Sequence, residues 1–209
     1  MKPGGVKNGP AASAAAASGV ADAILGFIRR IPGSSERKSR VPAKAARSRA
    51  NAAAAKAALA AGTLALPPGP LGWLTILPEL VAVWKIQSQM VADIAALYGK
   101  KSTLTEEQMV YCLFRHSAAQ AVRDLVVRVG ERVLVRRASL AVLQSIAQKV
   151  GLKLTQKVIG RGLSRWIPVA GALGVGAYAW YDTAQVAATA IGLFEREIEL
   201  EASHDPAAV

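Results

Sequence analysis

Leu64–Gly99, LALPPGPLGWLTILPELVAVWKIQSQMVADIAALYG, is the stretch on which the fold of this chain depends. Its first half is apolar, but it contains prolines that forbid one straight helix: Pro67, Pro68, Pro70 and Pro78. Its second half, Glu79–Tyr98, repeats its apolar residues with the helical period of 3.6. We therefore expect irregular chain or short helical pieces over Leu64–Pro78, with Pro78 in the first turn of the following helix and Gly99 as its C-cap.

Other helical segments follow from the same reading of the chain. Trp166–Phe194 repeats the design of an apolar helix opened by proline, and its helix should begin at Pro168 and end near Leu200. Thr105 and Gln108 form a capping-box pattern that opens a helix running to roughly Val135. Alanine-rich Ala43–Ala61 and the segment Ser139–Ile159 should also be helical.

These helices predict an all-α protein. No alternating Val/Ile/Thr/aromatic run bounded by turns stands out, so we expect no strands. The predicted architecture is a compact helical bundle built around two Pro/Gly-opened apolar helical units, Leu64–Gly99 and Trp166–Phe194. These units should pack on each other instead of spanning a bilayer, since Lys85, Asp93 and Asp182 interrupt their apolar runs.

The chain of 209 residues suits one domain with flanking segments. Residues 1–42 read as a low-complexity basic N-terminal arm, which holds a short amphipathic helix at Val20–Arg30 and a linker at Ile31–Pro42. Residues 43–200 form the predicted helical domain, and residues 201–209 a frayed tail. The single cysteine, Cys112, allows no internal disulfide, which fits a reducing compartment.

The net charge of +12 is distributed in blocks. Residues 1–60 carry 11 Lys and Arg against 2 acids, and residues 115–165 also carry 11 against 2. Residues 166–209 are acidic, with 1 cation against 6 acids. Two basic blocks and an acidic end indicate an anionic partner, either lipid headgroups or nucleic acid.

The sharpest pattern in the chain is a ladder of five cations at i+4 spacing, which we call the basic ladder: Lys149, Lys153, Lys157, Arg161 and Arg165. Arg128, Arg132 and Arg136 repeat the spacing in the preceding predicted helix. An ordinary solvated face mixes both signs of charge, whereas here like charges repel each other along one helix. We therefore expect the ladder to bind an anionic surface.

Lipid fits this basic region better than nucleic acid does. Residues 115–165 hold no Trp, Tyr or Phe, so the stacking side chains of nucleic-acid modules are missing there. The four tryptophans instead accompany the apolar stretches, as interfacial aromatics do: Trp73, Trp84, Trp166 and Trp180. The expected partner is an anionic membrane surface, with a membrane protein or transporter as a further partner; a soluble protein–protein adaptor and a nucleic-acid-binding protein are the alternatives.

Short motifs in the two apolar units resemble the EcsC family of bacterial proteins. The first unit contributes Pro67-Pro68-Gly69-Pro70, Leu77-Pro78-Glu79 and Ala95-Ala96-Leu97-Tyr98-Gly99, and the second contributes Ile167-Pro168-Val169-Ala170-Gly171-Ala172. The resemblance covers about residues 45–195. It implies an all-helical, membrane-associated bacterial protein without established catalytic residues, at the cytoplasmic side of the inner membrane or in the cytoplasm, with a link to transport or secretion.

Few residues offer chemistry. Cys112 and His116 are four residues apart and could form an activated thiolate, but no nearby acid clearly orients the imidazole, so a buried cysteine beside a polar histidine is the simpler interpretation. We expect no enzyme, no cofactor and no metal site. Asp182 is the only charge between Arg165 and Glu195, and is either exposed or paired with a group such as Lys85.

A glycine string, Gly171, Gly174 and Gly176, resembles a phosphate loop only in spacing, because no strand precedes it. Small residues four apart instead allow another helix to approach closely. We predict that these glycines serve helix packing.

Overall fold

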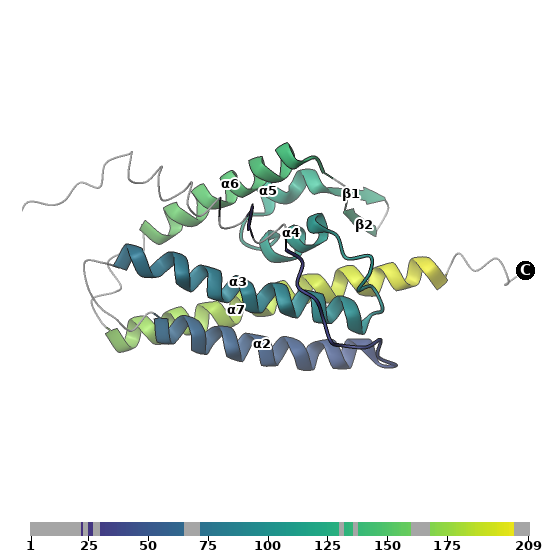
Figure 1. Cartoon of the computed structure of the whole chain (residues 1–209), viewed down its shortest axis with the longest axis horizontal. Coiled ribbons are helices and arrows are strands. Elements are labelled where there is room, and N and C mark those ends of the chain that lie inside the picture. Colours follow the sequence, from purple (N-terminus) through teal and green to yellow (C-terminus); the bar gives the residue numbers. More distant parts are fainter. Residues whose placement is uncertain are drawn as a thin grey trace, which may run out of the picture.

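The computed structural model describes residues 22, 25–26, 30–64, 72–129, 132–135, 138–159 and 168–202. Helices α2 (Pro42–Leu64), α3 (Gly72–Leu97) and α7 (Pro168–Ala202) lie side by side, and α2 runs antiparallel to the other two (Figure 1). The two apolar units are therefore in contact, as the sequence predicts, and α7 also packs along α2. The all-α class is confirmed.

The core of this layer combines small and large side chains. On α2, buried alanines recur every three or four residues and let the neighbouring helices come close: Ala46, Ala50, Ala53, Ala57 and Ala61. Larger buried residues of α3 and α7, among them Val91, Ile94 and Phe194, fill the space between the helices. Alanine thus supplies both the helix propensity and the packing surface of α2.

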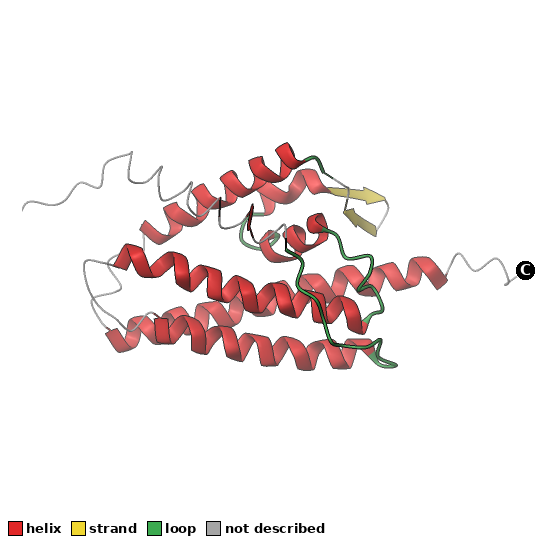
Figure 2. Cartoon of the chain, viewed as in Figure 1, coloured by secondary structure: helices red, strands yellow, loops and turns green. Residues whose placement is uncertain are grey.

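A second group of elements covers one side of α3 and α7 (Figures 1 and 2). It begins with α4 (Glu106–Phe114) and the short α5 (Ala119–Val122), followed by a 3-10 turn at Arg123–Leu125. Strands β1 (Val126–Val129) and β2 (Arg132–Val135) pair antiparallel, with Val126 opposite Val135. Helix α6 (Leu140–Ile159) completes the group.

The expectation of a helix from Thr105 to Val135, and of no strands, is wrong. Helix α4 ends at Phe114, and residues 126–129 and 132–135 pair as antiparallel strands instead. This segment has the sequence VVRVGERVLV, so β-branched valines fill five of the eight positions on the two sides of a Gly-Glu pair. Valine loses side-chain freedom in a helix and packs well on a strand, and two residues suffice to connect hairpin strands.

The start of α3 also differs from the prediction. The helix begins at Gly72, so Pro78 lies inside it and not in its first turn. A proline in that place removes one i→i−4 hydrogen bond, a cost that packing of the rest of the helix offsets. Residues 65–71, which include Pro67, Pro68 and Pro70, lie outside the described residues.

Both predicted helix caps are confirmed. Gly99 has a φ of +79°, and the N–H groups of Gly99 and Lys100 donate to the carbonyls of Ala96 and Ala95, which ends α3 in a Schellman motif. At α4, Thr105 and Gln108 exchange side-chain and backbone hydrogen bonds as a capping box. Helices α6 and α7 begin within a residue of their predicted starts.

Residues 30–41 are part of the packed body, contrary to the prediction of a linker. This extended segment crosses α3 (Figure 1), where the Ser39 N–H donates to the Leu97 carbonyl at 2.9 Å. The Ser34 hydroxyl donates to Asp93 Oδ1 at 2.7 Å, and Gln89 Nε2 donates to the Gly33 carbonyl at 2.9 Å. Most of the predicted arm helix at Val20–Arg30, and residues 203–209 of the tail, lie outside the described residues.

Candidate functional site

A polar cluster joins α3, α7 and the turn after α4 in the middle of an otherwise apolar layer. His116 Nε2 lies 2.5 Å from Asp182 Oδ1, and Gln87 Nε2 donates to Asp182 Oδ2 at 2.8 Å and to the Thr183 hydroxyl at 3.2 Å. The side chains of His116 and Asp182 are 17% and 16% exposed, and Gln87 and Thr183 are fully buried. Buried polar groups that find partners in this way hold helices in one register.

This cluster corrects the prediction for Asp182. Its carboxylate is neither exposed nor paired with Lys85, whose side chain is exposed. Lys85 and Gln87 are two residues apart on α3, so they point to different sides of the helix, and it is Gln87 that faces α7. Gln87 and Thr183 are not among the residues predicted from sequence; the signal that could have indicated them is an uncharged amide and a hydroxyl within apolar helices.

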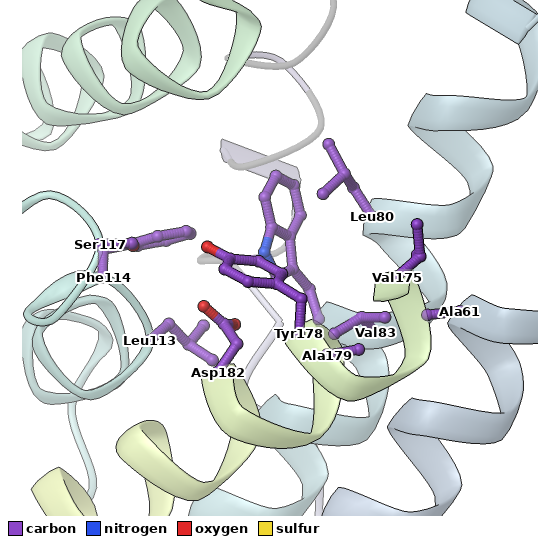
Figure 3. A pocket seen from close by; sticks show the side chains of 11 residues that line it. Ala61, Leu80, Val83, Leu113, Phe114, Ser117, Val175, Tyr178, Ala179 and Asp182 are labelled. Carbon is purple, nitrogen blue, oxygen red and sulfur yellow. The ribbon is translucent and has the colours of Figure 1, made fainter. Parts of the chain in front are cut away.

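A pocket of about 70 Å³ lies beside the cluster, between α2, α3, α7 and the end of α4 (Figure 3). Asp182 and Tyr178 line it from α7, and Leu113, Phe114 and Ser117 line it from α4 and the turn after it. The rest of the lining is apolar: Ala61, Leu80, Val83, Trp84, Val175 and Ala179. The pocket has the size of a packing gap between helices, with one carboxylate at its edge.

Cys112 and His116 do not form a nucleophile–base pair in this arrangement. Cys112 is fully buried, and α4 ends between the two residues. His116 Nε2 is engaged by Asp182, and its Nδ1 atom is buried without a hydrogen-bond partner in the structure. Asp182 could orient the imidazole, but a thiol that substrate cannot reach does not supply nucleophilic chemistry. Among the described residues, no three His, Cys, Asp or Glu side chains gather as they would around a metal ion.

The glycines of α7 differ in their surroundings. A Cβ atom built on Gly176 would lie 3.0 Å from the Ala58 carbonyl oxygen and 3.9 Å from Gly62 Cα, so α2 and α7 approach closely there. Gly174 is exposed, and a Cβ atom on it would meet nothing within 4 Å. Gly171 lies in the first turn of α7. The small-residue contact thus joins α7 to α2 at Gly176.

The basic ladder is only partly described. Lys149 is exposed on α6, whose buried side consists of Leu143, Ile146, Ala147 and Val150. Lys153 and Lys157 lie farther along α6, and Arg161 and Arg165 lie outside the described residues. Each i+4 step advances about 40° beyond one full turn, so the ladder winds around the helix axis.

The predicted repeat of the ladder before α6 is wrong. Arg128 lies in β1 and Arg132 in β2, where i+4 spacing does not place side chains on one helix face. Arg136 lies outside the described residues.

The tryptophans also separate into different environments. Trp84 is buried in the core and packs edge-to-face on Phe114, with ring centroids 5.7 Å apart, so it is not interfacial. Trp180 is 48% exposed on α7. By length and composition, the described residues contain one helical stretch that could cross a membrane, Leu80–Leu97, and 61% of it is buried inside the protein, as in a core helix.

The protein is all-α. Helices α3 and α7, which contain the two apolar units, pack with the antiparallel helix α2, and the buried polar cluster joins α3 to α7. The model of the EcsC protein family matches residues 34–196, and the chain belongs to this family. The match begins eleven residues before the start expected from the motifs, inside the segment that packs on α3. No curated protein and no solved structure matches the chain significantly.

Proposed function

We propose that this EcsC-family protein is non-catalytic and attaches peripherally to an anionic membrane surface, at the cytoplasmic face of the bacterial inner membrane. The supporting observation is the exposure of cations on helices that contain no acid. Helix α2 holds Lys and Arg and helix α6 holds Lys, and neither contains Asp or Glu. Arg47 and Lys56 of α2 and Lys149 of α6 are exposed. Such surfaces are attracted to anionic leaflets by about 1 kcal/mol for each cation near the surface.

Lipid headgroups suit these helices better than nucleic acid does. Neither α2 nor α6 contains a Trp, Tyr or Phe on which a base could stack. A role as a scaffold or regulator linked to transport or secretion is compatible with this attachment, and it is the part of the proposal that rests on the family resemblance. A transporter or another membrane protein is the corresponding partner.

Co-sedimentation with lipid vesicles tests the proposal. The protein should sediment with vesicles that contain phosphatidylglycerol and stay in solution with pure phosphatidylcholine, and binding should weaken as salt screens the charges. The reversal Lys153→Glu, Lys157→Glu, Arg161→Glu should remove most of the binding. The exposed pair Gln144→Ala, Gln148→Ala on the same helix serves as the matched control and should bind like the natural protein.

Two results would contradict the proposal. Equal binding by the charge-reversed variant would show that the ladder is not the attachment site. Tighter, salt-sensitive binding to DNA than to anionic vesicles, measured side by side, would favour the nucleic-acid alternative.

A further inference from the structure

An apolar surface without charge runs along the outer side of α7. Large side chains are exposed there, with Leu173 at 70%, Trp180 at 48% and Tyr181 at 56%. Gly174, Ala177 and Ala188 are exposed between and beyond them. We call this surface the α7 stripe: Leu173, Gly174, Ala177, Trp180, Tyr181 and Ala188.

The α7 stripe is the side of the helix that no other described element covers. The opposite side of α7 is buried, with Gly176 against α2 and Thr183 at the polar cluster. Residues 173–188 contain one charge, Asp182, and its carboxylate is turned inward to His116 and Gln87. The polar cluster therefore removes the only charge that could have been presented to a partner along four turns of helix.

Exposed cations lie on α2, the helix that packs beside the stripe. The close contact at Gly176 and Ala58 brings α2 alongside α7, and Leu59, the residue after Ala58, is 70% exposed. Farther along α2, Arg47 and Lys56 are exposed, and α2 holds no acidic residue. An uncharged surface with Trp and Tyr, flanked by cations, matches the interfacial zone of an anionic leaflet, where aromatic rings lie at headgroup level and cations meet phosphates.

We propose that the α7 stripe inserts shallowly into an anionic phospholipid leaflet, with the α2 cations resting on the headgroups. This inference rests on the proposed membrane attachment. It adds an apolar membrane contact on α7, whereas the basic ladder begins on α6. A second copy of the chain is a poorer occupant. A two-fold contact centred on the stripe would bring two acid-free α2 helices toward each other, and their like charges would repel.

An environment-sensitive probe on the stripe tests the inference. Ala177→Cys carries an NBD label in the full chain, and Ser102→Cys, exposed in the loop before α4, carries it as the control. Cys112 is fully buried, so the label reports on the new cysteine. With vesicles of phosphatidylglycerol and phosphatidylcholine in equal amounts, NBD at position 177 should brighten, shift to the blue and be quenched by spin-labelled lipid, while NBD at position 102 should not.

Side-chain variants give a second readout. Trp180→Ser with Tyr181→Ser should weaken vesicle binding by about tenfold, equivalent to about 1.4 kcal/mol of lost insertion. Val41→Ser removes another exposed apolar side chain, 60% exposed and off the stripe, and should leave binding unchanged. All three substituted side chains are on the surface, and circular dichroism of each variant checks that it is folded.

The outcomes separate the inference from the proposed function. Failure to bind any anionic vesicle would overturn the proposed function, and the inference with it. Salt-sensitive binding in which the probe at position 177 stays in water would overturn the inference alone. A dimer that dissociates on Trp180→Ser, with the probe shielded before vesicles are added, would assign the stripe to a second copy and also overturn it.

Discussion

His116 and Asp182 hold the end of α4 against α7, because each side chain satisfies a buried polar group of the other. His116→Ala and Asp182→Ala should each destabilise the protein by about 1–3 kcal/mol, since each leaves a polar atom of the other residue without its partner. A double-mutant cycle measured by urea unfolding should give a coupling energy of about 0.5–3 kcal/mol. Lys85→Ala with Asp182→Ala is the control, and its effects should add. Additive effects for His116 and Asp182 as well would contradict their pairing.

Ionisation of the Tyr98 hydroxyl makes the stability of the protein depend on pH. Burial, followed by the Glu195 carboxylate, raises the pKa of its hydroxyl above the usual 10.0, while Arg47 acts in the opposite direction. The unfolded chain then releases the proton more readily, so this contribution to stability is full below about pH 10 and is lost as pH rises through the folded pKa. No hydrogen-bond partner meets the hydroxyl in the structure.

Tyr98→Phe removes that titration. The variant should therefore keep more of its unfolding free energy than the natural protein does as the pH rises above about 10. At neutral pH it should be as stable or more stable, because a buried hydroxyl without a partner is removed. Chemical unfolding across the alkaline range measures both effects, and parallel pH profiles for the two proteins would disprove them.

At the scale of the helices, two glycines of α7 form a matched pair. Gly174→Ala gains helix propensity, about 1 kcal/mol, in open space. Gly176→Ala gains the same propensity, but its Cβ atom would meet the Ala58 carbonyl oxygen at 3.0 Å, so the backbone of α2 would have to move away from α7. We expect Gly176→Ala to be less stable than Gly174→Ala by about 1–3 kcal/mol in thermal or urea unfolding. Equal stabilities would mean that α2 and α7 are not in close contact.

The helix caps at Thr105 and Gly99 were predictable from sequence, because their signals are local. The Thr105–Gln108 capping box and the Gly99 C-cap each use residues within a few positions of one another. The hairpin at residues 126–135 was missed because its valines also fit a helical period when the pairing across its turn is ignored. The predicted start of α3 was too late in the chain. Proline is common in the first turn of a helix, which suggested a start at Pro78, whereas α3 begins at Gly72.

At the scale of the whole molecule, residues 30–41 act as a strap across α3. A chain that starts at Pro42 should be less stable than one that starts at Arg30, since it loses the bonds of Ser34 to Asp93 and of Ser39 to Leu97 and the packing of Ile31 on the core. The loss should amount to about 2–4 kcal/mol of unfolding free energy, from the lost hydrogen bonds and one apolar side chain. Equal thermal midpoints for the two chains would show that the strap is only a connection.

The sequence by itself determined the all-α class, the long helices, their caps and the distribution of charge, because helix period, capping residues and net charge are properties of neighbouring positions. The motifs of the two apolar units were also enough to indicate the family. The tertiary structure alone decided which partner Asp182 takes, which glycine meets α2 and which side of α7 remains exposed. His116 and Asp182 are 66 residues apart in the chain, and a contact over that separation depends on how the helices pack, which no local pattern encodes.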